Sequence, residues 1–250
     1  MLEEPGRALV EFVRENFPRR GDFLAYGVPA LLLAYGYLGV AAVLRSRCDV
    51  PTAYTRKVFH FLIFFTAALL DVFAGTRVLC LFGGMVSVGV LHALLCGEGH
   101  PFYEALAREK DAPRRSYYVV APYLATLFGG VVSHVFFGAA ALYGFLVTGL
   151  ADALAEPVGA RWGKRWYRVT AVRGVSATRS YEGSLAVFLA SALALSLGVL
   201  LSGGDVLVPR LVASLHGIAV ACTVVEAFSP HGWDNATLQV TATALAANTF

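Results

Sequence analysis

Apolar residues in this chain come in long blocks that are almost free of charge. Residues 23–44 hold no charged side chain. A helix rises about 1.5 Å per residue, so about 20 apolar residues cross the roughly 30 Å hydrocarbon core of a bilayer. Similar blocks follow at residues 58–74, 78–96, 117–132, 135–150, 185–201, 206–225 and 236–250. The pattern predicts an all-α, polytopic transmembrane helical bundle with seven or eight spans.

The first 22 residues have a different pattern, polar and mixed in charge. Apolar residues recur there at helical spacing, at Leu9, Val10, Val13 and Phe17. This pattern predicts an amphipathic helix on the membrane surface, residues 1–22, followed by a membrane domain, residues 23–250. The first apolar block begins late and can span, and acidic residues precede it, so we expect neither a secretory signal nor a transit peptide. A prokaryotic cell membrane is the expected location.

Composition supports a membrane protein and excludes other classes. Hydrophobic residues make up 57% of the chain and charged residues 15%, with a mean hydropathy of +0.64. A net charge of +3 is too small to indicate a nucleic-acid partner. The cysteines stand far apart without a Cys-x-x-Cys pair, which argues against a zinc site or a disulfide framework.

Three charged loops are expected on one side of the membrane, because two predicted spans separate each loop from the next. The third loop carries six cations with little acid nearby: Arg161, Lys164, Arg165, Arg168, Arg173 and Arg179. Since cytoplasmic loops carry an excess of Lys and Arg, we expect these loops to face the cytoplasm.

Polar side chains cluster where spans meet this side. The clusters are Arg56, Lys57 and His60; Asp152 and Glu156; and Glu226 and Asp234. Charge at span ends is costly and marks candidate sites. Carboxylates that hold Mg²⁺ and cations that neutralise phosphate oxygens are the groups that phosphoryl transfer needs.

Asp152 and Glu156 are four residues apart and share a helix face, which suits a metal ion bound directly or through water. The alternative is a pair of interfacial acids solvated by lipid headgroups. Glycines follow, and they would let the backbone approach a phosphate that cations then clamp. These residues are Gly159, Arg161, Gly163 and Lys164.

One further cluster, and two of those named above, extend the candidate site. Arg179, Ser180, Gly183 and Ser184 precede a predicted span, and a helix N-terminus there would offer free N–H groups to an anion. The alternative is an ordinary N-cap. His60 would orient a nucleotide or accept a hydroxyl proton, or simply bond a backbone carbonyl. Glu226, Asp234 and Asn235 would complete metal coordination or bind ribose.

In this order, the motifs resemble the polyprenol kinase family, which includes dolichol kinase, phytol kinase and CTP-dependent diacylglycerol kinase. The similar motifs are Arg56-Lys57-x-x-His60, Asp152 through Gly159-x-x-x-Gly163-Lys164, Arg179-Ser180-x-x-Gly183-Ser184, and Glu226 with Asp234-Asn235. Departures are Arg179 in place of Lys, Ala151 in place of Gly, and Ala160 before Arg161. Arg in place of Lys keeps the charge but changes a point contact into a fork.

The resemblance implies a multi-span kinase that phosphorylates an isoprenoid or other lipid alcohol at the cytoplasmic face, using CTP and Mg²⁺. Its partners would be the lipid alcohol, the nucleoside triphosphate and membrane lipids. The implied catalytic residues are Asp152 and His60, and the metal ligands are Asp152, Glu156, Glu226 and Asp234. The implied nucleotide contacts are Arg56, Lys57, Gly159, Arg161, Gly163, Lys164, Arg179, Ser180, Gly183, Ser184 and Asn235.

Two other functions are compatible with the clusters. A cytidylyltransferase would let a lipid phosphate attack the α-phosphate of CTP and release pyrophosphate. A transporter of anions or lipids would line a path with the same charges, but it predicts pairs deep in the spans rather than at one mouth. The sequence leaves open which alcohol is the acceptor, and which acid is the base.

Overall fold

The structure, a computed structural model, describes residues 3–171, 175, 177–206 and 209–250. Arg173, counted above among the loop cations, lies outside them. The longer helices are α1 (Glu3–Asn16), α3 (Val28–Ser46), α4 (Thr52–Phe73), α5 (Thr76–Cys96), α7 (Tyr117–Phe137), α9 (Ala153–Trp162), α10 (Tyr181–Leu201), α11 (Pro209–Phe228) and α12 (Asp234–Ala247). Shorter elements are α2 (Arg20–Asp22), η1 (Phe23–Gly27), α6 (Pro101–Leu106), η2 (Glu109–Asp111), η3 (Gly138–Ala140), α8 (Ala141–Val147) and η4 (Thr148–Asp152).

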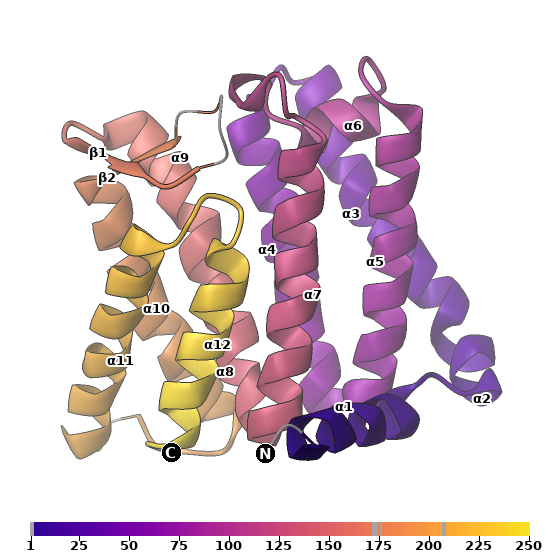
Figure 1. Cartoon of the computed structure of the whole chain (residues 1–250), viewed down its shortest axis with the longest axis vertical. Helices are drawn as coiled ribbons and strands as arrows, with labels where there is room; N and C mark the ends of the chain where they lie inside the picture. The colour runs from indigo at the N-terminus through magenta and orange to yellow at the C-terminus, as the bar shows by residue number, and fades with distance from the viewer. Residues whose placement is uncertain (1–2, 172–174, 176, 207–208) are drawn as a thin grey trace.

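The long helices stand side by side in one bundle (Figure 1). One end carries α6, α9 and a hairpin of two strands, β1 (Trp166–Val169) and β2 (Ala177–Ser180), and we call it the hairpin end. Helix α1 lies across the opposite end, beneath α5 and α7, where both termini also lie. The all-α membrane-type bundle is thus as predicted.

Among the described residues, five helical stretches are long and apolar enough to cross a membrane: Arg20–Ser46, Thr76–Cys96, Tyr117–Trp162, Tyr181–Leu201 and Pro209–Phe228. Helix α4 has 22 residues, but Arg56, Lys57 and Asp71 make it more polar than these. Helix α12 has 14 residues, about 21 Å, which is shorter than the hydrocarbon core. The count of seven or eight spans therefore stays a prediction.

The stretch Tyr117–Trp162 reverses direction within its 46 residues, so α8 and α9 run back beside the bundle (Figure 1). The predicted spans 117–132 and 135–150 put the turn between them, around Ser133 and His134, which was wrong by about one helical turn. The turn falls at Gly138, where φ is +54°. A glycine adopts this left-handed conformation without the steric cost of a Cβ, which explains the position.

Helix α10 shows why the bundle needs an apolar surrounding. Leu185, Leu189 and Leu193 lie four residues apart on one face and are each more than half exposed. Three uncovered leucines in a row would be costly in water and are typical of a lipid-facing helix.

Small residues let α7, α8 and α12 pack closely. A Cβ on Gly144 would lie 2.2 Å from Thr243 Oγ1, and one on Gly129 would lie 2.7 Å from Gln239 Oε1. Close approach through small residues is typical of helix contacts in membranes. This packing fixes the start of α12, which carries Asp234 and Asn235, against α7.

The hairpin was not predicted. Its strands are antiparallel, with Trp166 opposite Ser180 and Val169 opposite Ala177. The sequence analysis treated this region as a charged loop because cations dominate it. Aromatic and β-branched residues alternate with those cations, and such residues favour strands. The hairpin leads directly into α10 and so places Arg179 and Ser180 over the end of the bundle.

Candidate functional site

A cavity of about 120 Å³ lies beneath the hairpin, and we call it the charged cavity. Segments that are distant in the sequence meet around it: the start of α4, the loop around η2, η4 with α9, β2 with the start of α10, and the junction of α11 and α12. The charged residues that line it are Arg56, Lys57, Arg108, Lys110, Asp111, Asp152, Glu156, Arg179, Glu226 and Asp234. Cations and carboxylates from five separate segments after α3 therefore share one space.

Asp152 holds the centre of this arrangement. Its Oδ2 accepts a hydrogen bond from Lys57 Nζ at 2.7 Å and lies 3.4 Å from His60 Nε2. Lys57 and His60 are one turn apart on α4, and all three side chains are buried. His60 Nε2 also lies 3.0 Å from the carbonyl oxygen of Thr148, which can only accept, so this nitrogen carries the proton. His60 therefore orients the carboxylate and does not offer Nε2 as a base.

A π-helical turn, η4, positions Asp152. Such turns widen a helix, leave carbonyl groups free and occur often at functional sites. One of these carbonyls belongs to Thr148 and accepts from His60. Gly149 permits the turn to press against α4, since a Cβ there would lie 2.6 Å from Phe64 Cβ. Sequence patterns alone do not indicate this feature.

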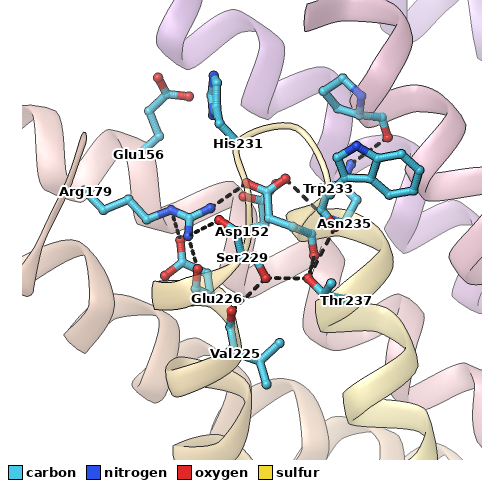
Figure 2. A network of polar contacts seen from close by, with 12 residues as sticks. Asp152, Glu156, Arg179, Val225, Glu226, Ser229, His231, Trp233, Asn235 and Thr237 are labelled. Carbon is cyan, nitrogen blue, oxygen red and sulfur yellow. Dashed lines mark hydrogen bonds and ion pairs between the residues drawn. The ribbon is translucent and has the colours of Figure 1, made fainter. Parts of the chain in front are cut away.

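Arg179 joins β2 to the α11–α12 junction. Its Nε lies 2.9 Å from Glu226 Oε1, and its Nη2 lies 3.0 Å from Asp234 Oδ2. Its Nη1 donates to the carbonyl oxygens of Glu226 and Ser229. Figure 2 shows the guanidinium reaching towards these groups, with Glu156 and His231 nearby. Burial acts to lower the pKa of Arg179, but the charges of Asp234 and Glu226 raise it, so this cation stays charged.

The sequence analysis missed a second ion cluster at the edge of the cavity. Arg108 donates from Nη1 to Glu156 Oε1 at 2.7 Å and from Nε to Asp111 Oδ2 at 2.8 Å, while Lys110 Nζ also donates to Glu156. Arg108 Nη2 lies 2.6 Å from His231 Nε2. Arg108 and Lys110 belong to the second of the three charged loops and were not singled out as candidate site residues. Their predicted side of the membrane, shared with the other charged loops, was the signal that could have found them.

The ionisation of this cluster follows from its contacts. Burial acts to lower the pKa of Arg108 but Glu156 and Asp111 raise it, whereas burial acts to raise the pKa of Asp111 but the charge and the hydrogen bond of Arg108 lower it. Burial lowers the pKa of His231. Arg108 and Asp111 are therefore charged and His231 is neutral, so His231 Nε2 accepts from Arg108, its nearer neighbour, rather than donating to Asp111 Oδ1 at 3.5 Å.

Arg56 differs from the other cations. Its Nη1 is buried and has no hydrogen-bond partner among the residues that the structure describes. Buried polar groups are nearly always paired, and an unpaired one calls for an explanation such as a missing ligand. Arg56 lines the charged cavity, so the unpaired donor belongs to a residue at the space where an anion would bind.

The predicted residues Gly159, Ser180 and Gly183 contribute to helix capping and to close helix packing. Ser180 is the N-cap of α10, with Oγ accepting from Gly183 N at 3.0 Å. A Cβ on Gly159 would lie 2.8 Å from that same Oγ, and a Cβ on Gly183 would lie 2.8 Å from the carbonyl oxygen of Ala155. These glycines also line the cavity. They let α9 and the start of α10 approach closely, whereas the sequence analysis assigned them to phosphate.

Four other predicted residues lie away from the charged cavity. Arg161 and Lys164 are exposed, and the Arg161 guanidinium stacks over Trp162. Gly163 supports packing, since a Cβ there would lie 2.3 Å from the carbonyl oxygen of Gly159. Asn235 Nδ2 donates to Thr126 Oγ1 and to the Pro122 carbonyl oxygen and so braces α7. The structure thus places most, but not all, of the predicted site residues around the charged cavity.

The carboxylates of the cavity suit Mg²⁺ by type but are arranged as ion pairs. Asp152, Glu226 and Asp234 line the same cavity, and carboxylate oxygens are what Mg²⁺ prefers. Among the described residues, no group of three or more His, Cys, Asp or Glu side chains is close enough to hold a metal alone. Mg²⁺ usually binds through one or two carboxylates plus substrate phosphates, so the residues fit an ion that arrives with a nucleotide.

Comparison with known proteins gives a partial similarity. No family model matches the chain, and no solved structure matches it. Over 98 residues the chain is 36% identical to a protein of Synechocystis sp. named phytol kinase. The matched stretch covers 39% of this chain and 39% of that protein. The similarity supports a distant relationship to a kinase of a lipid alcohol.

Proposed function

We propose that this chain is a lipid-alcohol kinase that transfers the γ-phosphoryl group of CTP to the hydroxyl of an isoprenoid or similar alcohol. The observation that carries the proposal is Arg56, whose buried Nη1 lacks a partner at a cavity lined by further cations and carboxylates. The partial similarity to phytol kinase supports the same reaction class.

The cations suit a triphosphate. Arg56 contributes a free donor to a phosphate oxygen, and hydrogen bonds to an ionised group are the strong ones. Lys110 lies at the rim with its side chain 60% exposed, so it can turn from Glu156 to an incoming phosphate. Arg179 and Arg108 are held in place by their carboxylates and supply fixed positive charge. Phosphoryl transfer depends mainly on such positioning and charge.

Asp152 is the group proposed to receive the hydroxyl proton. The alcohol oxygen bonds to the γ-phosphorus, the bond from that phosphorus to the bridging β-oxygen breaks, CDP leaves, and the proton passes to the Asp152 carboxylate. Lys57 and His60 hold that carboxylate in place through Oδ2. Mg²⁺, held by Asp152, Glu226 or Asp234, would neutralise the charge on the phosphates.

Labelled CTP tests the proposal with purified protein in detergent, Mg²⁺ and a panel of phytol, geranylgeraniol, longer polyprenols and diacylglycerol. We expect label from the γ-phosphorus to appear in the lipid and CDP to be released. Transfer of label from the α-phosphorus with release of pyrophosphate would instead establish a cytidylyltransferase. A folded protein that transfers neither label to any alcohol would refute the kinase.

The Asp152→Asn variant tests the assigned residue. We expect loss of at least about a hundredfold in turnover, within the range that removal of a general base produces. Asp49→Asn is the matched control, because Asp49 is fully exposed at its side chain and lies outside the cavity. Normal turnover by Asp152→Asn would remove Asp152 from the mechanism.

A further inference from the structure

An apolar cavity of about 310 Å³ lies between α4, α5 and α7, away from the charged cavity. Hydrocarbon side chains make up most of its wall, including Ile63, Leu79, Phe82, Leu127 and Phe145. Cavities with such walls stay dry and take up apolar ligands. We call this space the apolar cavity, and the charged residues of the site do not explain it.

A small cavity of about 50 Å³ lies between the two spaces, and we call it the connecting cavity. Arg56 lines both the charged cavity and the connecting cavity, while Ile63, Tyr123 and Thr126 line both the connecting cavity and the apolar cavity. His60 also lines the connecting cavity. The three neighbouring cavities therefore have polar groups at one end of the row and hydrocarbon at the other.

Tyr123 stands at the junction. Its hydroxyl forms a short hydrogen bond with Ser87 Oγ, which joins α7 to α5 across the mouth of the apolar cavity. Tyr123 lines both the connecting cavity and the apolar cavity, so a ligand that occupies both would lie against its ring.

Phe12 of α1 bounds the far end of the apolar cavity, beside His134. The two ring centroids are 6.0 Å apart. Phe12 also lines another apolar cavity, of about 420 Å³, between α1 and α5. Tyr123 and His134 are eleven positions apart on α7, so the apolar cavity extends roughly 16 Å along the helix.

Building on the proposed function, we propose that the apolar cavity holds the hydrocarbon chain of the acceptor alcohol. The hydroxyl end lies in the connecting cavity, near Arg56 and Asp152, and the far end of the chain lies against Phe12. The distance from Tyr123 to Phe12 then limits chain length, which favours alcohols of the length of geranylgeraniol or phytol over long polyprenols. The small connecting cavity favours a hydroxyl over a phospholipid headgroup as the polar end.

Gly83 offers a way to fill the apolar cavity. It lines the cavity, and no described residue beyond its own stretch of helix has an atom within 4 Å of the position its Cβ would take, so a larger side chain begins in open space. We expect Gly83→Leu to lower kcat/KM for geranylgeraniol by at least about tenfold, because its side chain occupies the space of several methylene groups. For geraniol, which is two isoprene units shorter, the change stays within about twofold.

Gly217→Leu is the matched control. Gly217 also has open space around its Cβ position, but it lies on α11 and faces away from the bundle. We expect wild-type kcat/KM for both alcohols. Phe12→Ala tests the far end of the apolar cavity: joining the two apolar cavities should raise kcat/KM for alcohols longer than geranylgeraniol relative to geranylgeraniol. Chain-length preference unchanged in both Gly83→Leu and Phe12→Ala would overturn the inference.

Photolabelling provides a readout that does not need turnover. A geranylgeraniol analogue with a diazirine on its last isoprene unit should label α1 near Phe12 and α7 near His134, and Gly83→Leu should abolish that labelling. Label confined to outward-facing residues, such as Leu189 and Val220, would overturn the inference. Absent kinase activity with correct labelling would refute only the proposed function, and activity with misplaced labelling would refute only the chain site.

Discussion

The Arg56→Gln variant tests whether Arg56 binds a ligand or supports the fold, because the two roles predict opposite changes in the stability of the protein. Arg56 Nη1 is buried without a partner among the described residues. An unsatisfied buried polar group costs about 1–3 kcal/mol, and more when it is charged. Removing it should leave the free energy of unfolding unchanged or raise it by up to roughly 3 kcal/mol. At about 2–4 °C per kcal/mol for a chain of this size, the melting temperature should not fall.

The same variant should bind CTP more weakly, although its stability does not fall. A hydrogen bond to a charged ligand contributes about 1.5–3 kcal/mol, which corresponds to a loss of CTP affinity of roughly ten- to a hundredfold. The assay is CTP titration of the detergent-purified protein with Mg²⁺, alongside a thermal melt of the same sample. Arg47→Gln is the control, since Arg47 is exposed and does not line the charged cavity. Wild-type CTP affinity, or a clear loss of stability, would refute the assignment of Arg56 to a phosphate.

Three further predictions concern residues that support the charged cavity. Arg179→Gln leaves Glu226 buried without its cation, so it should lower the free energy of unfolding by about 3–5 kcal/mol in a denaturation assay; an unchanged value would contradict the network. Burial lowers the pKa of His231 below its ordinary 6.5, so the unfolded chain binds a proton that the folded chain does not, and stability should fall as pH falls through about 6.5. Thermal melts between about pH 8 and about pH 5 should show a shallower fall in His231→Gln, and equal slopes would contradict this assignment. Gly159→Ala should cost about 1–3 kcal/mol through its clash with Ser180, whereas Gly217→Ala should be neutral or stabilising by up to about 1 kcal/mol; equal melting temperatures would contradict close packing there.

The sequence predicted the site residues best where charged side chains fall at the ends of apolar spans, because few structural roles explain a charge there. Arg56, Lys57 and His60 fall on adjacent turns of one span, and Asp152 and Glu156 fall at the end of another, so their costly charges marked a site before any contact was known. The order of spans placed their loops on one side. Those inferences need only helix periodicity and the cost of burying charge. The structure places Arg56, Lys57, Asp152 and Glu156 around one cavity, with His60 beside Asp152.

The remaining features depend on tertiary contacts that no local pattern encodes. Arg108 and His231 are far apart in the chain and meet only because the loops fold over the bundle end. Glycines at 159 and 183 are equally compatible with phosphate contact and with helix packing, and only the position of Ser180 distinguishes the two roles. Gly138 sets the reversal between α7 and α8 through a positive φ, and a glycine in an apolar block does not by itself reveal this.

The most direct test of the central claim is a structure of the protein with Mg²⁺ and a non-hydrolysable CTP analogue. We predict that the triphosphate occupies the charged cavity, with a phosphate oxygen within hydrogen-bonding distance of Arg56 Nη1 and the metal on a carboxylate of the Asp152, Glu226 and Asp234 set. An analogue bound elsewhere on the protein, with the charged cavity unchanged and Arg56 still unpaired, would contradict the account.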